Sequence, residues 1–222
     1  MELYWRINIQ YVSSCRNNQD VRSYSKGDDG IVTFNIFVNI YFKSSMMIYL
    51  EYIIYFKRSD YVFHEEILRL INLHHEGSYW DFKKQWYSDK CDLLHDIICM
   101  ANNLENRDAY IIVGIDEENN FRFIDVSKDS NRKNTQMLVD FLKDKKFVGG
   151  TRPSVHVEIL DYGVATIDVI VVENSYNTPF YLAERFQQIQ ANSIYTRIQD
   201  TNTPIDKSAD INNVEYLWKK MF

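Results

Sequence analysis

Two carboxylates and a lysine stand close together in residues 76–83, EGSYWDFK. Asp81 and Lys83 are two residues apart, so on a β-strand their side chains share a face. Glu76 precedes that strand, and the bend at Gly77-Ser78 brings its carboxylate back towards Asp81. Paired carboxylates are groups that proteins use for proton transfer and for binding hard cations. The segment is therefore a candidate catalytic site, although solvated surface acids are a more common cause of such spacing.

A second pair of acids, Asp116 and Glu117, follows an apolar run that begins at Ala109. An unbroken apolar run is typical of a central strand covered on both faces. Acids at the end of such a strand lie at the edge of the sheet, where binding sites often collect. Strand-end acids are also ordinary solubilising residues, and the spacing leaves both interpretations open.

The charge of the chain restricts how it would bind nucleic acid. The formal net charge is −6, which argues against binding a phosphate backbone through overall charge alone. Residues 128–152 differ from this average, with seven basic side chains against three acidic ones. The seven are Lys128, Arg132, Lys133, Lys143, Lys145, Lys146 and Arg152. This stretch is either a local phosphate-facing patch or the solvated surface of a helix and its loops.

Hydrophobic periodicity predicts the elements that must position these residues. Helices are expected over residues 64–75, after a cap at Ser88-Asp89, over residues 135–146, and from Asp210 onward. The residues expected to be buried in the last helix are Ile211, Val214, Leu217 and Trp218. Strands are expected over residues 79–86, 109–115, 121–126, 155–160, 165–172, 180–182 and 194–197.

The strand expected over residues 79–86 alternates between apolar and polar side chains. Its apolar face, with Trp80, Phe82 and Trp86, should lie in the core, and its other, polar face should remain outside that core. Helices and strands around one core indicate an α+β or mixed α/β domain over residues 61–222.

Residues 1–60 form an N-terminal extension in which we find no motif. Residues 31–38 are β-prone, and the polar residues 23–30 are expected to form a loop. The apolar residues 31–56 are interrupted by charges, and each apolar run is shorter than the roughly 20 residues that span a bilayer. We therefore expect no membrane role.

Other features define the setting of the protein. Cys15, Cys91 and Cys99 form neither a CxxC pair nor an even framework, which favours a reducing, cytoplasmic location. Met1 leads into polar and charged residues without a small-residue cleavage site, so no signal peptide is expected. Neither a Walker loop nor a GxGxxG motif occurs, so the residues themselves give ATP binding no support.

Four segments in order resemble the Schlafen AlbA-like family. Members of that family show a Glu, an acid five residues later in Glu-Phe-Lys, a helix ending in Ala-Phe-Ala-Asn and a strand ending in Gly-Val-Asp-Asp. The counterparts here are Glu76, Asp81-Phe82-Lys83, Cys99-Met100-Ala101-Asn102 and Gly114-Ile115-Asp116-Glu117. The tail over residues 195–202 and the final Leu217-Trp218 helix also look like the end of this family's domain. The resemblance covers residues 63–222.

The sequence departs from the family pattern in three places. Residues 102–109 lack the glycine pair that members carry before the central strand, which argues against close approach of a phosphate to that backbone. Asp81 is one methylene shorter than the usual Glu, and Glu117 is one methylene longer than the usual Asp. These two exchanges either offset each other around a metal ion or remove catalysis.

The resemblance implies a nucleic-acid-binding domain, and some members are metal-dependent endoribonucleases that act on structured RNA such as transfer RNA. It assigns catalysis to Glu76, Asp81, Lys83 and Glu117. It assigns Mg²⁺ or Mn²⁺ to Glu76, Asp81, Asp116 and Glu117, because hard cations prefer carboxylate oxygens. The residues expected to bind nucleic acid, with RNA favoured over DNA, are Lys83, Lys84, Arg132, Lys133, Lys145, Lys146 and Arg152.

Two questions stay open at this level. Many bacterial relatives are described only as DNA-binding or ATP-binding regulators, so the alternative is a non-catalytic regulatory module. Longer members of the family hold nucleic acid between two AlbA-like lobes, whereas this chain contains only one such lobe. A symmetric homodimer would supply the second lobe and would cover residues 31–56. The alternative is that this segment folds back onto its own domain.

Overall fold

The computed structural model describes residues 24–26, 32–34 and 62–220. The chain divides into two compact units, Met1–Phe56 and Lys57–Phe222. In the first unit, Tyr24–Lys26 (β1) pairs with Val32–Phe34 (β2) in antiparallel fashion. The loop expected over residues 23–30 is therefore wrong where β1 lies. The remainder of the β-prone run and of the apolar residues 31–56 falls outside the described residues.

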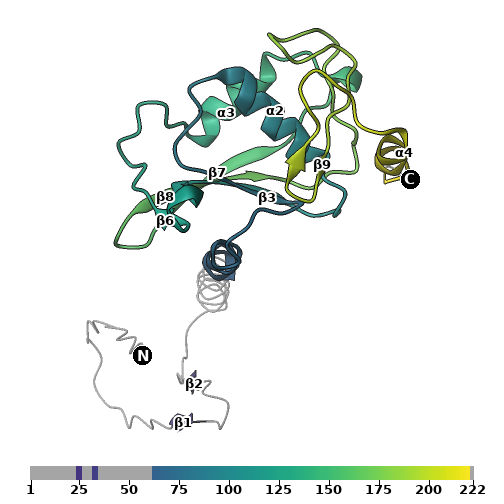
Figure 1. The fold of residues 1–222 in the computed structure, drawn as a ribbon. Helices are drawn as coiled ribbons and strands as arrows, with labels where there is room; N and C mark the ends of the chain where they lie inside the picture. The colour runs from purple at the N-terminus through teal and green to yellow at the C-terminus, as the bar shows by residue number, and fades with distance from the viewer. Residues whose placement is uncertain (1–23, 27–31, 35–61, 221–222) are drawn as a thin grey trace, which may run out of the picture. The chain divides into compact units, whose positions relative to one another are not determined.

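A four-stranded sheet with the order β3-β4-β8-β7 forms the centre of the second unit (Figure 1). Its strands are Trp80–Lys83 (β3), Ala109–Val113 (β4), Val155–Asp161 (β7) and Thr166–Val172 (β8). β3 is parallel to β4, whereas β8 is antiparallel to both β4 and β7. This mixed sheet with its helices confirms the predicted α+β or mixed α/β class.

Helices cover both faces of the sheet. A helix over residues 62–72 packs on the face that carries Trp80 and Phe82. Lys90–Ala101 (α2) and Thr135–Lys143 (α3) pack on the other face. The start expected at Ser88-Asp89 is confirmed, because the Asp89 carboxylate accepts a hydrogen bond from the first turn of α2.

The covering of both faces corrects the interpretation of β3. Asp81 lies opposite Trp80 and Phe82 on the face under α2, and it is only 2% exposed. The polar face of this strand is thus inside the domain, and a buried carboxylate there needs counter-charges and hydrogen-bond donors. Trp86 lies beyond the end of β3 and packs in the cluster under α2, on the opposite face from the one expected.

Short elements complete the domain. Ile115–Asp116 (β5) pairs with Arg122–Phe123 (β6), with the 3₁₀ turn Glu117–Asn119 (η1) between them, and a second turn covers Val148–Gly150 (η2). Arg197–Ile198 (β9) pairs with Thr201–Asn202 (β10). The strand expected over residues 180–182 is wrong, because Leu182 makes only an isolated bridge to Phe147.

The last helix, Ile211–Lys219 (α4), lies at the surface of the domain (Figure 1). Its fully buried residue is Leu217, whereas Ile211 is 69% exposed and Trp218 is 42% exposed. The prediction that both of these would be buried is wrong, since the helix contacts the domain along a narrow line. Within the described part of the chain, we find no helix whose length and hydrophobicity would let it span a bilayer.

Candidate functional site

A buried arginine, Arg197, ties the acidic segment before and within β3 to the C-terminal part of the domain. Its side chain is 2% exposed, and one terminal nitrogen lies 2.8 Å from a Glu76 oxygen and 3.2 Å from an Asp81 oxygen. Its Nε donates to the Gly77 carbonyl at 2.7 Å, and its other terminal nitrogen donates to the Asn202 side chain at 3.0 Å. The guanidinium thus fixes two carboxylates at one point.

The bend at Gly77-Ser78 returns Glu76 towards the strand, as the sequence predicts. Glu76 Oε1 accepts a hydrogen bond from the backbone N–H of Phe82 at 2.9 Å. The bend is tight, since the Gly77 N–H donates to the Trp80 carbonyl at 3.1 Å. A Cβ atom at Gly77 would lie 2.2 Å from the Trp80 ring, so glycine is needed for steric reasons.

The electrostatics of the pair follow from this geometry. Burial, and then the neighbouring Asp81 carboxylate, raise the pKa of Glu76 to about 7, against the opposing hydrogen bonds from Phe82 and Arg197. Two carboxylates at close range resist simultaneous ionisation, which is why Asp81 acts to raise the pKa of Glu76. At neutral pH the pair therefore favours taking up a proton or a further cation.

Lys83 and Asp96 extend this group of charges towards α2. The Lys83 ammonium donates to the Asp81 carboxylate and lies 3.5 Å from Asp96 Oδ2. Asp96 accepts further hydrogen bonds from the Tyr87 hydroxyl at 2.6 Å and from the Asn202 amide at 2.8 Å. Burial alone would lower the pKa of Lys83, but Asp81 and Asp96 raise it overall, so the ammonium stays charged.

Glu117, an exposed acid at the start of η1, lies near enough to this group for its charges to act on it. Partial burial, and then the charge of Asp81, raise its pKa, while Lys83 and Arg197 act in the opposite sense. The turn that leads there starts at Gly114, which has a φ of 112°. A Cβ atom at that position would lie 2.7 Å from the Ile124 carbonyl, so the sharp exit from β4 requires glycine.

Asp116 binds a different set of groups. Its side chain is 1% exposed and contacts Lys84 at 2.9 Å, Asn119 at 2.8 Å and Arg122 at 3.7 Å. The hydrogen bond from Lys84 is the main reason that the pKa of Asp116 is lowered. Asp116 ends β5 and Glu117 begins η1, so the chain turns between them and their side chains have different surroundings. Of the four expected metal ligands, the structure thus brings Glu76 and Asp81 together at Arg197, with Glu117 near enough for the charge of Asp81 to affect it, and it sets Asp116 apart.

The chemistry of these carboxylates can be compared with the needs of a metal ion. Across the residues that the structure describes, no group of three or more acidic, histidine or cysteine side chains is arranged closely enough to hold an ion. Carboxylate oxygens suit Mg²⁺ and Mn²⁺, which often bind one or two carboxylates and retain water. Here Arg197 and Lys83 already contact Asp81. Metal binding therefore stays a prediction, in which an ion would compete with Lys83 for Asp81.

The other residues expected to bind nucleic acid lie elsewhere, and several have partners. Arg132 forms a two-pronged ion pair with Asp168, and Lys146 pairs with Glu184 at 2.7 Å. Lys145 lies over the rings of Phe141 and Phe186 at 4.5 and 4.6 Å. The Lys133 ammonium donates to the Asn131 carbonyl at 2.7 Å, and Arg152 is exposed in the loop before β7. The basic stretch therefore offers less unpaired charge than its composition indicates.

Sequence reasoning did not identify four members of the cluster, which are Tyr87, Asp96, Arg197 and Asn202. For Arg197 and Asn202 there was a signal, since both belong to the tail that resembles the end of the family's domain. Asp96 and Tyr87 carry no comparable signal, because a single polar residue on an apolar helix is usually interpreted as exposed. Their place depends on contacts between distant segments.

The fold and the cluster together define an α+β domain with a buried, arginine-bridged acid pair at the edge of its sheet. The family model described as Schlafen, AlbA_2 matches residues 76–206. This match covers more than half of the chain, so the protein belongs to the Schlafen AlbA_2 family, which is generally nucleic-acid-related. The matched region begins at Glu76 and includes Arg197, so it contains both sides of the cluster. No curated protein is significantly similar to the chain.

Proposed function

We propose that this domain binds structured RNA and cleaves a phosphodiester bond at the cluster of Glu76, Asp81, Lys83 and Glu117. The observation that carries this proposal is the convergence of Glu76 and Asp81 on the buried Arg197, although Glu76 and Arg197 are 121 residues apart in the sequence. A buried carboxylate with a strongly raised pKa, held by a charge partner from a distant segment, is a common mark of a functional site.

The charge of the cluster supports a role for a divalent ion. Four carboxylates (Glu76, Asp81, Asp96 and Glu117) face two cations (Lys83 and Arg197). If all six groups are ionised, the sum is −4 plus +2, which leaves −2. Uptake of a proton by Glu76 relieves part of this excess, and one Mg²⁺ or Mn²⁺ would balance it in full.

The residues of the cluster divide into two roles in this proposal. Glu76, Asp81 and Glu117 would hold the ion, which when bound supplies charge stabilisation and an activated nucleophile for phosphodiester cleavage. The side chain of Lys83 is 31% exposed, so its ammonium is available to a phosphate oxygen. Arg197 is buried and fully engaged, which makes it a positioning residue that orients the two carboxylates.

The proposal is tested with end-labelled transfer RNA in the presence of Mg²⁺, Mn²⁺ or EDTA. We expect cleavage only with a divalent ion, and we expect Asp81→Asn and Glu117→Gln to abolish it. Glu118→Gln is the matched control, since Glu118 is an exposed acid in the same turn as Glu117. Cleavage that is equal in EDTA, or equal in Asp81→Asn and wild type, would contradict the proposal.

The second candidate is a non-catalytic nucleic-acid-binding module. It is favoured by the occupation of Asp81 by Arg197 and Lys83, which leaves no three-ligand group among the described residues. Its signature is RNA or DNA that is retained at low salt and stays intact with every ion tested. Comparison of RNA and DNA of one sequence in the same binding assay distinguishes the two nucleic acids.

A further inference from the structure

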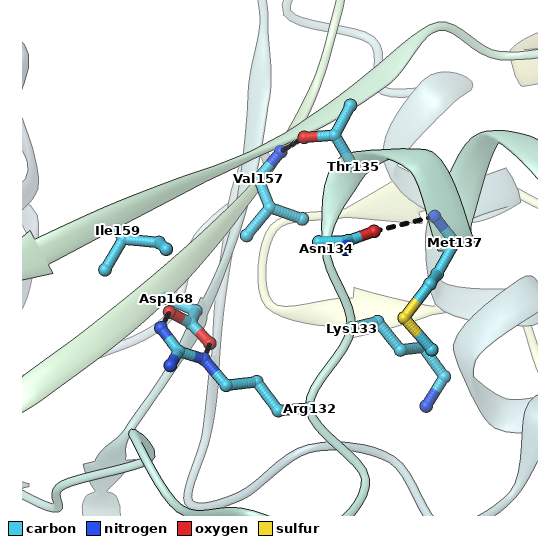
Figure 2. A pocket seen from close by; sticks show the side chains of 8 residues that line it. All are labelled: Arg132, Lys133, Asn134, Thr135, Met137, Val157, Ile159 and Asp168. Carbon is cyan, nitrogen blue, oxygen red and sulfur yellow. Dashed lines mark hydrogen bonds and ion pairs between the residues drawn. The ribbon is translucent and has the colours of Figure 1, made fainter.

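A pocket of about 300 Å³ opens between the start of α3 and the strands β7 and β8 (Figure 2). The residues that line it include Arg132, Lys133, Met137, Val157, Ile159 and Asp168. The volume reaches the lower end of the range for small-ligand sites. The pocket contains none of the residues of the Glu76–Asp81 cluster, so the function proposed above does not account for it.

One side of the pocket is a fixed guanidinium plane. Arg132 donates from Nε and from Nη2 to the two oxygens of Asp168, each at 2.7 Å. Asp168 is fully buried and also accepts a hydrogen bond from the Trp86 indole at 2.7 Å. The Arg132 side chain itself is 26% exposed. Its plane is therefore held rigidly while part of it stays accessible, and guanidinium planes of this kind stack on nucleobases.

Three further side chains of the lining, from β7 and α3, are apolar, and two of them are exposed. Met137 is 52% exposed and Ile159 is 60% exposed, and both line the pocket with the half-buried Val157. Large apolar side chains beside a fixed cationic plane suit a flat ligand with an apolar face, such as an aromatic heterocycle. The thioether of Met137 adds a polarisable group that favours contact with aromatic rings.

Lys133 adds a second cation to the lining, and its ammonium donates to the Asn131 carbonyl at 2.7 Å. The Lys133 ammonium lies 5.8 Å from the centre of the Trp86 ring and lines the pocket beside Arg132. Burial, and then the like charge of Lys90, lower the pKa of Lys133. An anionic group at this point would relieve the repulsion between the two ammonium groups. The pocket therefore combines a flat apolar slot with a place for a phosphate, which together are the parts of a nucleotide.

The register of the sheet connects this pocket to the acidic cluster. Lys83 pairs with Val113, Val113 pairs with Asp168, and Asp168 pairs with Ile159, so the four residues form one row on one face. Neighbouring strands are about 4.8 Å apart, which places the two ends of the row roughly 14 Å apart in a straight line. Val113 and Asp168 in the middle of the row are fully buried, so a strand would have to pass over the surface above them, and at least about four nucleotides would separate the two sites.

We infer that the pocket binds one unstacked base of the same RNA strand whose phosphodiester lies at the Glu76–Asp81 cluster, with the base against the plane of Arg132 and the backbone phosphate near Lys133. This inference rests on the function proposed above. Only a base that is free of pairing can enter the pocket. The pocket would therefore help to select the position at which the RNA strand is held.

The test uses a fluorescein-labelled single-stranded RNA of about 12 nucleotides, a length within the range that single-strand-binding domains cover. Versions with one abasic nucleotide at each successive position are compared with the intact strand. Ile159→Ser and Met137→Ser change exposed residues, so the fold should persist, which the melting temperature checks. Ile211→Ser on α4 is the matched control, because Ile211 is an equally exposed aliphatic residue that does not line the pocket.

We expect wild type and the Ile211→Ser control to lose about tenfold in affinity when one particular position is abasic. Ile159→Ser should bind the intact strand about tenfold more weakly and should be indifferent to that abasic position, as in a double-mutant cycle. If Ile159→Ser and Met137→Ser bind the intact strand as tightly as wild type, the pocket is not a base site, although the proposed function would stand.

Two other outcomes also overturn the inference. A wild-type protein that binds no RNA at low salt would remove the proposed function and this inference together. A free mononucleotide is the other source of the same chemistry, so ATP is titrated in parallel. If ATP binds wild type but not Ile159→Ser, while no abasic position affects RNA binding, then the occupant is a free nucleotide and not a base of the strand.

Discussion

Replacement of Arg197 by methionine should destabilise the domain more than the substitution of any exposed charged residue. The substitution keeps much of the side-chain volume but leaves Glu76 and Asp81 without their shared cation, with side chains that are only 18% and 3% exposed. It also removes a donor from the buried Gly77 carbonyl. Breaking a buried ion pair by removing one partner costs about 3–5 kcal/mol. We expect a loss in the free energy of unfolding near the lower end of this range, about 3 kcal/mol. The loss is limited because Glu76 can take up a proton and because Lys83 still contacts Asp81.

The assay is urea denaturation of the full chain, followed by fluorescence at pH 7 and at pH 5. The charge explanation predicts a pH dependence. Without Arg197 the folded-state pKa of Glu76 rises further, and a carboxyl group with a raised folded-state pKa stabilises the fold at low pH and loses that contribution as pH rises. The difference between wild type and Arg197→Met should therefore be larger at pH 7 than at pH 5.

Two further variants isolate the cause. Arg107→Met removes an exposed arginine that pairs with Glu66 at 3.2 Å, and an exposed pair of this kind contributes about 1 kcal/mol or less. Glu76→Gln in the Arg197→Met background removes one uncompensated charge and should recover at least about 1 kcal/mol. If Arg197→Met lies within about 1 kcal/mol of wild type, or if Glu76→Gln brings no recovery, the buried-cation explanation is refuted.

Four other outcomes are expected from the structure and from the sequence. The free energy of unfolding of wild type should fall relative to Glu76→Gln as pH rises from 4.5 to about 7, because the pKa of Glu76 is raised over this window; paired denaturation series check this. Mn²⁺ or Mg²⁺ should raise the melting temperature of wild type through linkage, and Asp81→Ala should abolish the rise; an equal rise in the variant would place the ion elsewhere. Reversing the charges of Lys145 and Lys146 should weaken RNA binding more than reversing those of Lys57 and Arg58, with a shallow salt dependence in filter binding. A homodimer should appear in light scattering at tens of micromolar protein, and a strictly monomeric mass with RNA still bound tightly would leave binding by a single lobe.

The elements that the sequence predicts best are those defined by local signals. The start of α2 depends on Asp89, which caps its own first turn, and β7 and β8 have a turn at Gly163 with a φ of 77°. The elements predicted less well depend on neighbours. The apolar residues of α4 have helical spacing, but the domain offers only a narrow contact, so Ile211 stays exposed.

The candidate site likewise has parts that local sequence features predict and parts that depend on distant segments. The return of Glu76 towards Asp81 was predictable, because Gly77 and the strand that follows are local features. The burial of Asp81 was not, because the cation that makes it tolerable lies 116 residues further along the chain. A carboxylate in an alternating strand is normally assigned to the solvent side. Asp81 is buried instead because α2 covers this face of the sheet and Arg197 supplies a counter-charge.

The bridge between Glu76 and Arg197 also bears on the order in which the domain can mature. A ribosome releases the residues of β3 well before those of β9, so Glu76 and Asp81 emerge without the guanidinium that holds them. Closing a loop of this length is among the slower contacts a chain can make. A nascent domain would therefore contain the carboxylates before it contains the geometry that orients them. Any activity at the cluster should thus be absent from partly synthesised chains, and it should arise only when the β9–β10 ribbon has docked.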